Sequence, residues 1–508
     1  MGEGPRLREP KDHVADLRLH CDVVVVGSGP AGAIAAWRLA SAGVDVVLLE
    51  AGPWVRTFQP DVGRTLASSF WDGGVRVTRG NVLLPTLQAR CLGGGSVYNS
   101  AICMRPTTGA LARWRDAHGI DFTSGELDAD FDAVERLMGV KPVAPDVMGR
   151  RNELFLEAAK RLGWAAEVIQ RNEEGCQGSA NCILGCRVGA KLSMDRRSIP
   201  EAMALGARVV TGAVVDRLLL SRGRARGVEG HLINEAGESA HALRVTAKAT
   251  VLAAGTIATP ALMRRSGLRK PGIGDNLRFH PSTYLLGRFD SEILPWQGAT
   301  QGAHTTEFLD RGIKLESLWA DPAVFSIRFP VEGLAFQEWM ARWPQIAVWD
   351  GWVSGDDSVG AVREVGPRLD LTWNFGARDV KLLQETNALL AEMFRAAGAR
   401  EVLPGMRGLP AVLSADDAPE RIRAARVTAT DLPTASNHVF GATPMGADPA
   451  TAATDKHGAV YGTEDLYVVD TGLFPESPGV NPMLTAMALA HAIGGTVADR
   501  VASAARAP

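Results

Sequence analysis

The stretch that decides the fold is residues 22–52, DVVVVGSGPAGAIAAWRLASAGVDVVLLEAG. It starts with the β-branched run 23–26, which is typical of a buried parallel strand. A glycine-rich turn, G-x-G-x-x-G, follows at residues 27–32, then an apolar helical stretch at 33–42 and a second strand at 44–49. This order predicts a complete βαβ unit of the Rossmann type, and hence an α/β fold.

Each part of this unit suits the binding of a dinucleotide. Gly27 makes the tight turn, Gly29 lets the backbone approach a pyrophosphate, and Gly32 lets helix and strand pack closely. The helix N-terminus, which includes Ala31, faces the phosphate charge. Glu50 comes 23 positions after the first glycine, where a carboxylate accepts hydrogen bonds from the adenosine ribose. Because no second such unit appears later in the chain, a resident FAD is favoured over NAD.

Length, charge and hydropathy limit the possible functions. With 508 residues the chain has room for two to four domains or for one interleaved unit. The net charge of −3 gives no electrostatic reason to expect nucleic acid or an anionic membrane surface as a partner. The first twenty residues are charged throughout and no apolar run reaches the ~18 residues of a membrane span. We therefore expect a cytoplasmic enzyme with neither a nucleic-acid nor a membrane partner.

The cysteines are sparse, but three of them are close together. There are six in all, too few for a disulfide-stapled secreted scaffold. Cys176, Cys182 and Cys186 have no fourth cysteine and no histidine nearby, whereas structural zinc takes four ligands. We expect no metal site and interpret the three as buried, reduced thiols in a loop over the cofactor. A metal site and a disulfide are the alternatives. Lys191, in the same loop, is either a phosphate contact or a solvated lysine.

Five separated blocks of sequence carry a family resemblance. The first is the glycine-rich turn 27–32, which we call the cradle, with Glu50-Ala51-Gly52. The others are residues 93–99 (GGGSVYN), 251–260 (VLAAGTIATP), 274–281 (GDNLRFHP) and 438–485. In order and spacing the blocks resemble the glucose–methanol–choline (GMC) family of FAD-dependent oxidoreductases, and the resemblance runs from Cys21 to the end. The segment around the three cysteines looks like the long-chain alcohol oxidase branch, and the last eighty residues are similar to bacterial sterol oxidases.

The resemblance implies a domain layout and a set of cofactor contacts. An FAD-binding domain would be assembled from residues 1–280 and 427–508, with a sheet-based substrate-binding domain, 281–426, inserted between them. The segment 54–89 corresponds to the family's lid. FAD would be non-covalent, because Tyr98 stands where some relatives carry the histidine that bonds to the flavin. The implied cofactor contacts are Gly27, Gly29, Ala31, Gly32, Glu50, Ala51, Gly94, Ser96, Asn99, Val215, Gly255, Asp470, Asn481 and Pro482.

The resemblance also places the chemistry near the C-terminus. His438 begins the motif HVFGATPMG, in which Ala442 replaces the family's threonine. In the implied reaction a hydride moves from the carbinol carbon to flavin N5, and His438 takes the hydroxyl proton as general base. Asn481 would hold the substrate oxygen as charge develops on it. His280 is interpreted as structural, and Glu316 as an alternative extra base from the substrate domain.

The substrate is expected to be a hydrophobic alcohol that is oxidised to an aldehyde or ketone. Tryptophans are numerous in residues 281–426 while tyrosines are scarce, which favours a wide apolar pocket. A sugar or glycoside oxidase or dehydrogenase is the alternative enzyme. A lyase or light-driven decarboxylase on the same scaffold, and an inactive flavin-binding module, are the alternatives of other classes. The sequence leaves open the exact substrate, the electron acceptor (oxygen or another) and the oligomeric state.

Overall fold

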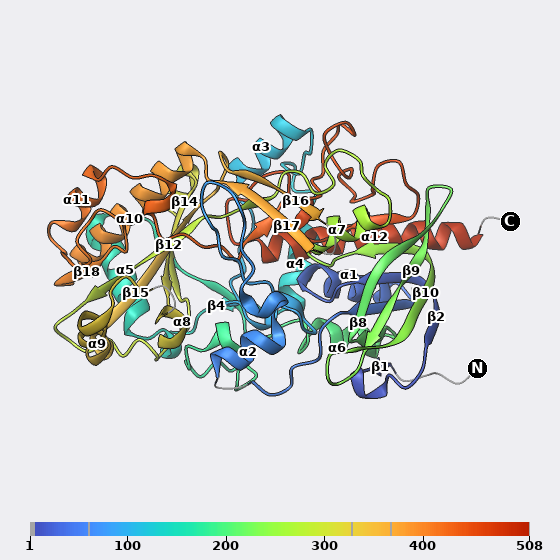
Figure 1. The fold of residues 1–508 in the computed structure, drawn as a ribbon, viewed down its shortest axis with the longest axis horizontal. Coiled ribbons are helices and arrows are strands. Elements are labelled where there is room, and N and C mark those ends of the chain that lie inside the picture. The colour runs from blue at the N-terminus through green and yellow to red at the C-terminus, as the bar shows by residue number, and fades with distance from the viewer. Residues whose placement is uncertain (1–5, 59–60, 327–328, 366–367, 507–508) are drawn as a thin grey trace.

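In the computed structural model the chain forms two lobes that lie side by side along the long axis (Figure 1). Both ends of the chain lie at the far end of one lobe, beside β2 (Leu17–Val26) and α12 (Met483–Arg506) (Figure 1). The other lobe is built around a second sheet. The structure describes residues 6–58, 61–326, 329–365 and 368–506.

The first lobe is built on a mostly parallel sheet. Its strands run in the order β1 (Leu7–Arg8), β7 (Arg208–Thr211), β3 (Val46–Glu50), β2, β10 (Ser239–Leu252), β9 (Arg224–Ile233) and β8 (Ala213–Ser221). The strands from β1 to β10 pair in parallel, whereas β9 and β8 form an antiparallel extension. The late strand β21 (Leu466–Val468) pairs in parallel with the C-terminal part of β10, so the end of the chain returns to the N-terminal sheet.

The predicted βαβ unit is present in this sheet, with shifted ends. Its helix is α1 (Pro30–Ser41), which starts earlier than expected because Pro30 fits the first turn of a helix. The valines at 23–26 are at most 5% exposed, as a central strand covered on both faces requires. Helix α12 packs along α1, while α6 (Ser198–Ala204) packs against α1 and α4 (Asp128–Leu137) against α12.

The second lobe is built on an antiparallel sheet. Its strands run in the order β19 (Leu413–Ser414), β18 (Glu401–Leu403), β12 (Ser282–Arg288), β15 (Ile346–Val353), β14 (Ile313–Leu318), β13 (Ala303–Thr305) and β5 (Ala166–Val168). The long helix α10 (Ala377–Ala397) lies against β12 and β15. Trp349 of β15 stacks on Phe394 of α10 with ring centroids 4.1 Å apart. Large aromatic side chains thus fill this core.

One segment departs from the expected division of the chain at residue 280. Helix α5 (Arg150–Leu162) and strand β5 precede that position, yet they belong to the second lobe. The buried face of α5, with Leu154 and Phe155, packs in the second hydrophobic core, and β5 completes the second sheet beside β13. The second core therefore draws on the chain before residue 280 as well.

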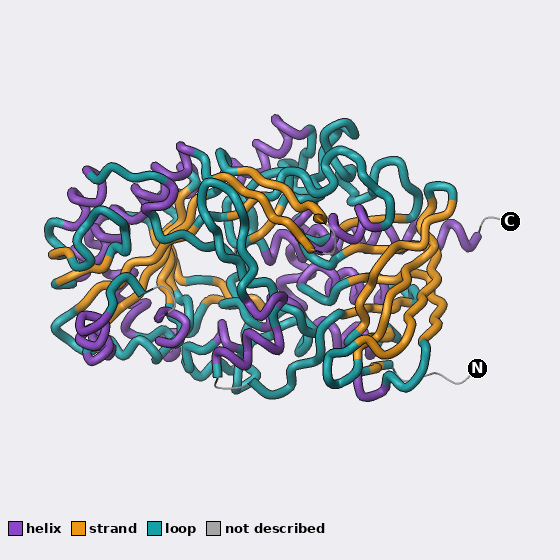
Figure 2. Tube along the Cα trace, in the orientation of Figure 1, coloured by secondary structure: helices purple, strands orange, loops and turns teal. Residues whose placement is uncertain are grey.

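The remaining elements surround and connect the lobes, and Figure 2 shows the two groups of strands apart with loops and helices between them. A short antiparallel pair, β11 (Arg278–Phe279) with β20 (Val439–Phe440), connects distant parts of the chain. No helix in the described ranges is both long and apolar enough to cross a membrane. The other α-helices and strands are α2 (Val62–Ser69), α3 (Thr108–His118), α7 (Ala258–Arg265), α8 (Pro322–Ser326), α9 (Gly333–Ala341), α11 (Ala418–Ala424), β4 (Val140–Pro142), β6 (Gln170–Asn172), β16 (Val359–Val365) and β17 (Arg368–Asn374).

Candidate functional site

Two histidines meet where β11 and β20 end. The antiparallel pairing of these strands continues to His280 and His438, whose Nδ1 atoms lie 3.1 Å apart. On its other side, His280 Nε2 lies 2.7 Å from Ser477 Oγ, which also accepts a hydrogen bond from the Gly479 N–H at 3.0 Å. His438, His280 and Ser477 therefore form a continuous hydrogen-bonded chain, so His280 does more than fill the core.

These hydrogen bonds determine which nitrogen of His438 is available to accept a proton. Its Nδ1 is committed to His280, and no hydrogen bond to its Nε2 is found from any described residue. If His438 Nε2 is to accept a proton, Nδ1 must carry the hydrogen and donate it to His280 Nδ1. His280 Nε2–H then donates to Ser477 Oγ. The opposite proton arrangement, with Ser477 as donor, has the same heavy-atom distances.

Trp352 lies against both histidines. Its ring stacks on His280, with centroids 4.2 Å apart and planes 7° from parallel, and it faces His438 edge-on at 6.0 Å. Its indole N–H donates to Glu316 Oε2 at 3.2 Å. Of the seven tryptophans in residues 281–426, Trp352 is the one in ring contact with these histidines, and most of the others are buried in the cores. The tryptophan count thus reflects core packing more than pocket lining.

A buried lysine, Lys314, links Asn481 to the group of side chains around Trp352. Lys314 Nζ donates to Asn481 Oδ1 and to Glu316 Oε1, both at 2.5 Å, and lies 5.8 Å from the centre of the Trp352 ring. Glu316 Oε2 also accepts from Gln301 Nε2 at 3.4 Å. The carboxylate of Glu316 is therefore committed to Lys314, Trp352 and Gln301, which does not fit the alternative that Glu316 is an extra base.

The electrostatics of the site keep both histidines neutral. Burial lowers the pKa of His438 to about 4; the charge of Glu316 opposes this shift and that of Lys314 adds to it. Burial also holds the pKa of His280 well below its usual value, and the charges of His438 and Lys314 act in the same direction. For Glu316, burial would raise the pKa, but the adjacent Lys314 outweighs it and lowers that pKa. A neutral His438 can accept a proton at physiological pH.

The glycines of the cradle divide into two kinds. A Cβ on Gly27 would lie 2.3 Å from the carbonyl oxygen of Ala253, and one on Gly32 would lie 2.0 Å from Gly27 O, so packing within the protein requires glycine at both positions. A Cβ on Gly29 would meet no atom within 4 Å. Gly29 thus borders open space at the N-terminus of α1, where a phosphate group would be held by backbone N–H groups.

Glu50 is tied into this turn at the end of β3. Its Oε2 accepts from the Ser28 hydroxyl at 2.6 Å and the Ser28 N–H at 3.1 Å, and its Oε1 accepts from the Gly52 N–H at 2.8 Å. Burial raises the pKa of Glu50, while these hydrogen bonds oppose the shift. The next residue, Ala51, accepts from Arg90 through its carbonyl at 3.4 Å. Oε2 already accepts two hydrogen bonds, whereas Oε1 accepts one and keeps acceptor capacity for a ligand hydroxyl.

The GGGSVYN block lies directly against the cradle. A Cβ on Gly94 would lie 2.7 Å from the Cα of Gly29, so the two glycine turns touch through their backbones. Ser96 Oγ donates to Gly93 O at 2.6 Å, which holds the turn. Asn99 accepts from the Ala101 N–H at 3.0 Å and directs its amide toward Met483 at the start of α12. The block therefore links the cradle to the C-terminal helix.

The other expected cofactor residues are distributed around the same lobe. Asp470 Oδ2 accepts from the Gly255 N–H at 2.9 Å and from Thr259 at 2.5 Å, which fixes the turn after β10. Pro482 immediately precedes α12 and accepts from the N–H of Ala486 through its carbonyl. Val215 lies within β8, opposite Gly230. The described structure thus gathers the cradle, these turns and the start of α12 in one lobe.

Comparisons with known proteins identify the family. A family model described as GMC oxidoreductase matches residues 23–282, and a second with the same description matches residues 356–490. The chain belongs to the GMC oxidoreductase family. This confirms the resemblance inferred from the five blocks. Membership makes the chain an FAD-dependent oxidoreductase that acts on CH–OH groups.

Several GMC relatives are similar over nearly the whole chain. An uncharacterised GMC-type oxidoreductase of Mycobacterium tuberculosis is 36% identical over 488 residues, covering 94% of this chain and 76% of that protein. A long-chain-alcohol oxidase (FAO3) of Arabidopsis thaliana is 28% identical, covering 95% and 68%. Among solved structures, pyridoxine 4-oxidase from Mesorbium loti is 20% identical with a TM-score of 0.68, covering 94% of this chain and 99% of that one, which shows the shared fold.

The GMC family implies FAD, and the described residues fit it. Gly29 borders open space, and so do Gly95 and Gly255, at which a Cβ would likewise meet no atom within 4 Å. The buried carboxylate of Glu50 lies at the end of β3, in the position of a ribose partner. When bound, FAD supplies the acceptor for a hydride. The residues that would hold it are those of the cradle, the GGGSVYN block and the N-terminus of α12.

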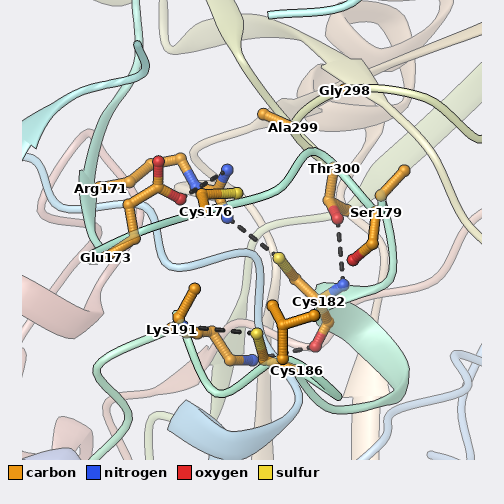
Figure 3. A pocket seen from close by; sticks show the side chains of 13 residues that line it. Arg171, Glu173, Cys176, Ser179, Cys182, Cys186, Lys191, Gly298, Ala299 and Thr300 are labelled. Carbon is orange, nitrogen blue, oxygen red and sulfur yellow. Dashed lines mark hydrogen bonds and ion pairs between the residues drawn. The ribbon is translucent and has the colours of Figure 1, made fainter. Parts of the chain in front are cut away.

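In this GMC chain Cys176, Cys182 and Cys186 line a small pocket together with Arg171, Glu173 and Lys191, and neither His438 nor His280 is among the lining residues (Figure 3). All six cysteines are free thiols, and no described set of side chains is arranged to hold a metal ion. Cys182 Sγ accepts from Arg171 at 3.0 Å. Burial would raise the pKa of Cys182, but the charges of Arg171 and Lys191 outweigh burial and lower it.

Lys191 fits neither of the roles expected for it. It is 2% exposed, and its ammonium donates to the carbonyl oxygens of Val97, Asn99 and Cys182 at 2.7–2.9 Å. A solvated lysine is therefore wrong, and a phosphate contact would need donors that are already used. Lys191 instead fastens the cysteine loop to the GGGSVYN block.

Sequence reasoning missed part of the site. The sequence pattern assigns no role at the site to Lys314, Trp352 or Ser477, and it indicates only a structural role for His280. The single signal in the sequence was the position of His280 within the GDNLRFHP block. Lys314 stands in a strand with no motif around it, and its partner Asn481 lies 167 residues away, so nothing local could reveal the contact.

Proposed function

We propose that the chain oxidises a hydrophobic alcohol to the aldehyde or ketone, with His438 as general base and Asn481 as the partner of the substrate oxygen. The observation that carries this proposal is the hydrogen-bonded chain from His438 through His280 to Ser477. When Nδ1–H of His438 donates to His280, this hydrogen-bonded chain leaves Nε2 of the neutral imidazole as an acceptor. A flavin would accept the hydride. The protein therefore has to supply a base for the hydroxyl proton and a hydrogen-bond donor for the substrate oxygen.

In this reaction His438 and Asn481 act on the hydroxyl group of the substrate, and His280 acts on His438. His438 Nε2 removes the hydroxyl proton, and the positive charge that develops on its ring is favoured by the nearby carboxylate of Glu316. Asn481 presents an amide N–H to the same oxygen, which accumulates negative charge as the proton leaves. His280 accepts the Nδ1 hydrogen of His438 and so keeps the base in the productive tautomer.

The preference for a hydrophobic substrate rests on the relatives. Long-chain-alcohol oxidases of Arabidopsis thaliana match at 26–28% identity over at least 95% of this chain. A polar substrate is the second candidate, because paromamine 6'-oxidase of Streptomyces fradiae is 27% identical over 98% of the chain. The buried polar side chains Lys314, Glu316 and Gln301 beside Asn481 are compatible with either class, since they satisfy one another.

A substrate panel under anaerobic conditions tests the proposal. The flavin-loaded enzyme would be mixed in the dark with 1-dodecanol, benzyl alcohol and glucose, and flavin absorbance followed. We expect 1-dodecanol or benzyl alcohol to bleach the flavin faster than glucose. Faster bleaching by glucose would support the sugar oxidase. No bleaching by any alcohol in the dark would contradict the oxidase reaction and favour a lyase or a light-driven decarboxylase.

We further propose that the FAD is non-covalent. Tyr98 is buried against Phe70, with ring centroids 4.9 Å apart, and offers no imidazole to the flavin. Acid precipitation should therefore release the yellow colour into the supernatant. Colour that stays with the precipitate would contradict this.

Oxygen is the proposed electron acceptor, since the relative FAO3 and the structural neighbour pyridoxine 4-oxidase are both named as oxidases. Release of hydrogen peroxide during turnover in air would support it. A cytoplasmic location is proposed from the six free thiols, which a reducing compartment preserves. Fractionation of cells that express the chain would test this location.

A further inference from the structure

Lys314 is a completely buried cation that the reaction proposed above does not use. It lies on β14 directly opposite Trp352 of β15, and its side chain is 0% exposed. An isolated buried ammonium is costly unless it is paired and hydrogen-bonded. Its Nζ has three acceptors among the described residues: Glu316 Oε1 and Asn481 Oδ1 at 2.5 Å, and Met104 Sδ at 2.9 Å. All three of its N–H donors are therefore committed.

The contact with Asn481 determines which way that carboxamide faces. An ammonium can donate but cannot accept, so the atom 2.5 Å from Lys314 Nζ has to be the amide oxygen. The amide nitrogen of Asn481 must then point away from Lys314. No hydrogen bond from this nitrogen to a described residue is found, although the side chain is only 6% exposed. Its N–H groups are thus available to a ligand.

The same lysine lies in a polar network that extends to the base. Glu316 neutralises Lys314 and accepts from the indole N–H of Trp352. Trp352 stacks on His280, which is hydrogen-bonded to His438. The amide of Asn481 and the imidazole of His438 are therefore held by one continuous set of contacts between the second sheet and the start of α12.

We propose that Lys314 is a positioning residue that fixes the carboxamide of Asn481 with its N–H groups directed at the substrate oxygen. The proposal rests on the function proposed above. Without Lys314 the amide is free to turn its oxygen toward the substrate, where it would repel the developing negative charge. With Lys314 the ammonium also polarises the amide, which makes its N–H groups stronger donors.

The first test is a double-mutant cycle on the rate of flavin reduction by 1-dodecanol or benzyl alcohol, whichever bleaches the flavin faster. Asn481→Ala should slow reduction by about 10²–10³-fold, the usual worth of such a donor. Lys314→Met, which keeps the length of the side chain without its charge, should slow it by about 10–10²-fold. Because Lys314 acts through Asn481, adding Lys314→Met to Asn481→Ala should cost almost nothing further.

An equal loss from Lys314→Met in both backgrounds would overturn the proposal, because the lysine would then act independently of the amide. A wild-type rate for Lys314→Met would also overturn it. A different result would contradict the proposed function itself: reduction of the flavin at the wild-type rate by both the His438→Ala and the Asn481→Ala enzymes. Slow His438→Ala and Asn481→Ala enzymes beside an unaffected Lys314→Met enzyme would refute the inference alone.

Lys314→Met leaves Glu316 as an uncompensated buried carboxylate, so this variant could fail to fold. Lys314→Met/Glu316→Gln removes both charges, keeps similar side-chain volumes, and should melt close to wild type. It should still show the loss in flavin reduction, because the amide of Asn481 is again unrestrained. A folded double variant that reduces its flavin at the wild-type rate would contradict the proposal.

A pH profile distinguishes positioning from simple packing. The titratable groups that act on His438 are His280, Lys314 and Glu316. Glu316 in turn lies between His304 of β13 and Asp350 of β15, whose neutral forms are favoured by burial. In Lys314→Met the unbalanced Glu316 should move the acid limb of flavin reduction to higher pH than in wild type. Lys314→Met/Glu316→Gln should move it back. An acid limb that does not move in Lys314→Met would contradict the charge arrangement on which the proposal depends.

Discussion

The phosphate cradle and the histidine site of this protein are held together in different ways. The cradle is backbone packed on backbone: Gly27, Gly32 and Gly94 each approach a neighbouring main chain more closely than a Cβ would allow. The histidine site is a network of side chains from distant segments, and its two histidines are 158 positions apart in the chain. The cofactor site is thus encoded by a short local sequence motif, whereas the groups that act on the substrate are brought together only when the chain folds.

The largest effect we predict separates two glycines of the cradle. Gly32→Val should prevent folding, because a side chain there collides with Gly27 O in a turn that cannot yield. Gly29→Val should give a folded protein with wild-type circular dichroism but no bound FAD, because its side chain enters only the open space at the cradle. Flavin absorbance and a melting curve would check both variants. A yellow, fully loaded Gly29→Val protein would refute the cradle assignment.

The next largest effect is expected for Asn481, the proposed hydrogen-bond donor to the substrate oxygen. Asn481→Ala should cost about 2.7–4 kcal/mol of transition-state stabilisation, measured as the anaerobic rate of flavin reduction. FAD content should stay the same, because the cradle is unaffected. Combined with His438→Ala, the loss should be smaller than the sum, since both residues act on one oxygen. Additive losses would mean that the two residues act on different steps.

A smaller effect is expected for the residue behind the base. His280→Ala should slow flavin reduction by about 10-fold, which corresponds to one hydrogen bond of about 1.4 kcal/mol. Ser477→Ala is the matched control one bond further along the chain, and it should cost less. Stopped-flow reduction with the same alcohol would measure both. A Ser477→Ala loss that exceeds the His280→Ala loss would contradict the proposed direction of proton donation.

The smallest effect on chemistry is expected in the cysteine loop. Cys182→Ser should lower the free energy of unfolding by about 1–3 kcal/mol, because it weakens the buried contact with Arg171, and it should leave flavin reduction nearly unchanged. Cys176→Ser is the control, since its side chain is less buried and should cost little. Metal analysis of both variants and of wild type completes the test. A stoichiometric metal that either variant loses would overturn the thiol interpretation.

Sequence alone could predict the family, the βαβ unit and the cradle because each is encoded by residues that are neighbours in the chain. Glycines at fixed spacing are required by close backbone contacts within the same motif, as the contact between Gly32 and Gly27 shows. The motif around His438 was predictable for the same reason. Lys314 was not, because a lysine in a strand is ordinarily exposed and only the folded structure brings its Nζ to Asn481, 167 positions away in the chain. The packing of α5 in the second core could not be predicted, because it depends on contacts between residues far apart in the sequence.

The most direct test of the central claim is the anaerobic rate of flavin reduction, followed across pH in wild type and His438→Ala. In wild type the rate should be flat at neutral pH and fall only as the pH drops through about 4, where His438 becomes protonated and no longer accepts the proton. His438→Ala should be slower by roughly 10²–10⁴-fold, with unchanged FAD content and melting temperature and a deficit that shrinks as pH rises. A His438→Ala enzyme that reduces its flavin at the wild-type rate would contradict the account.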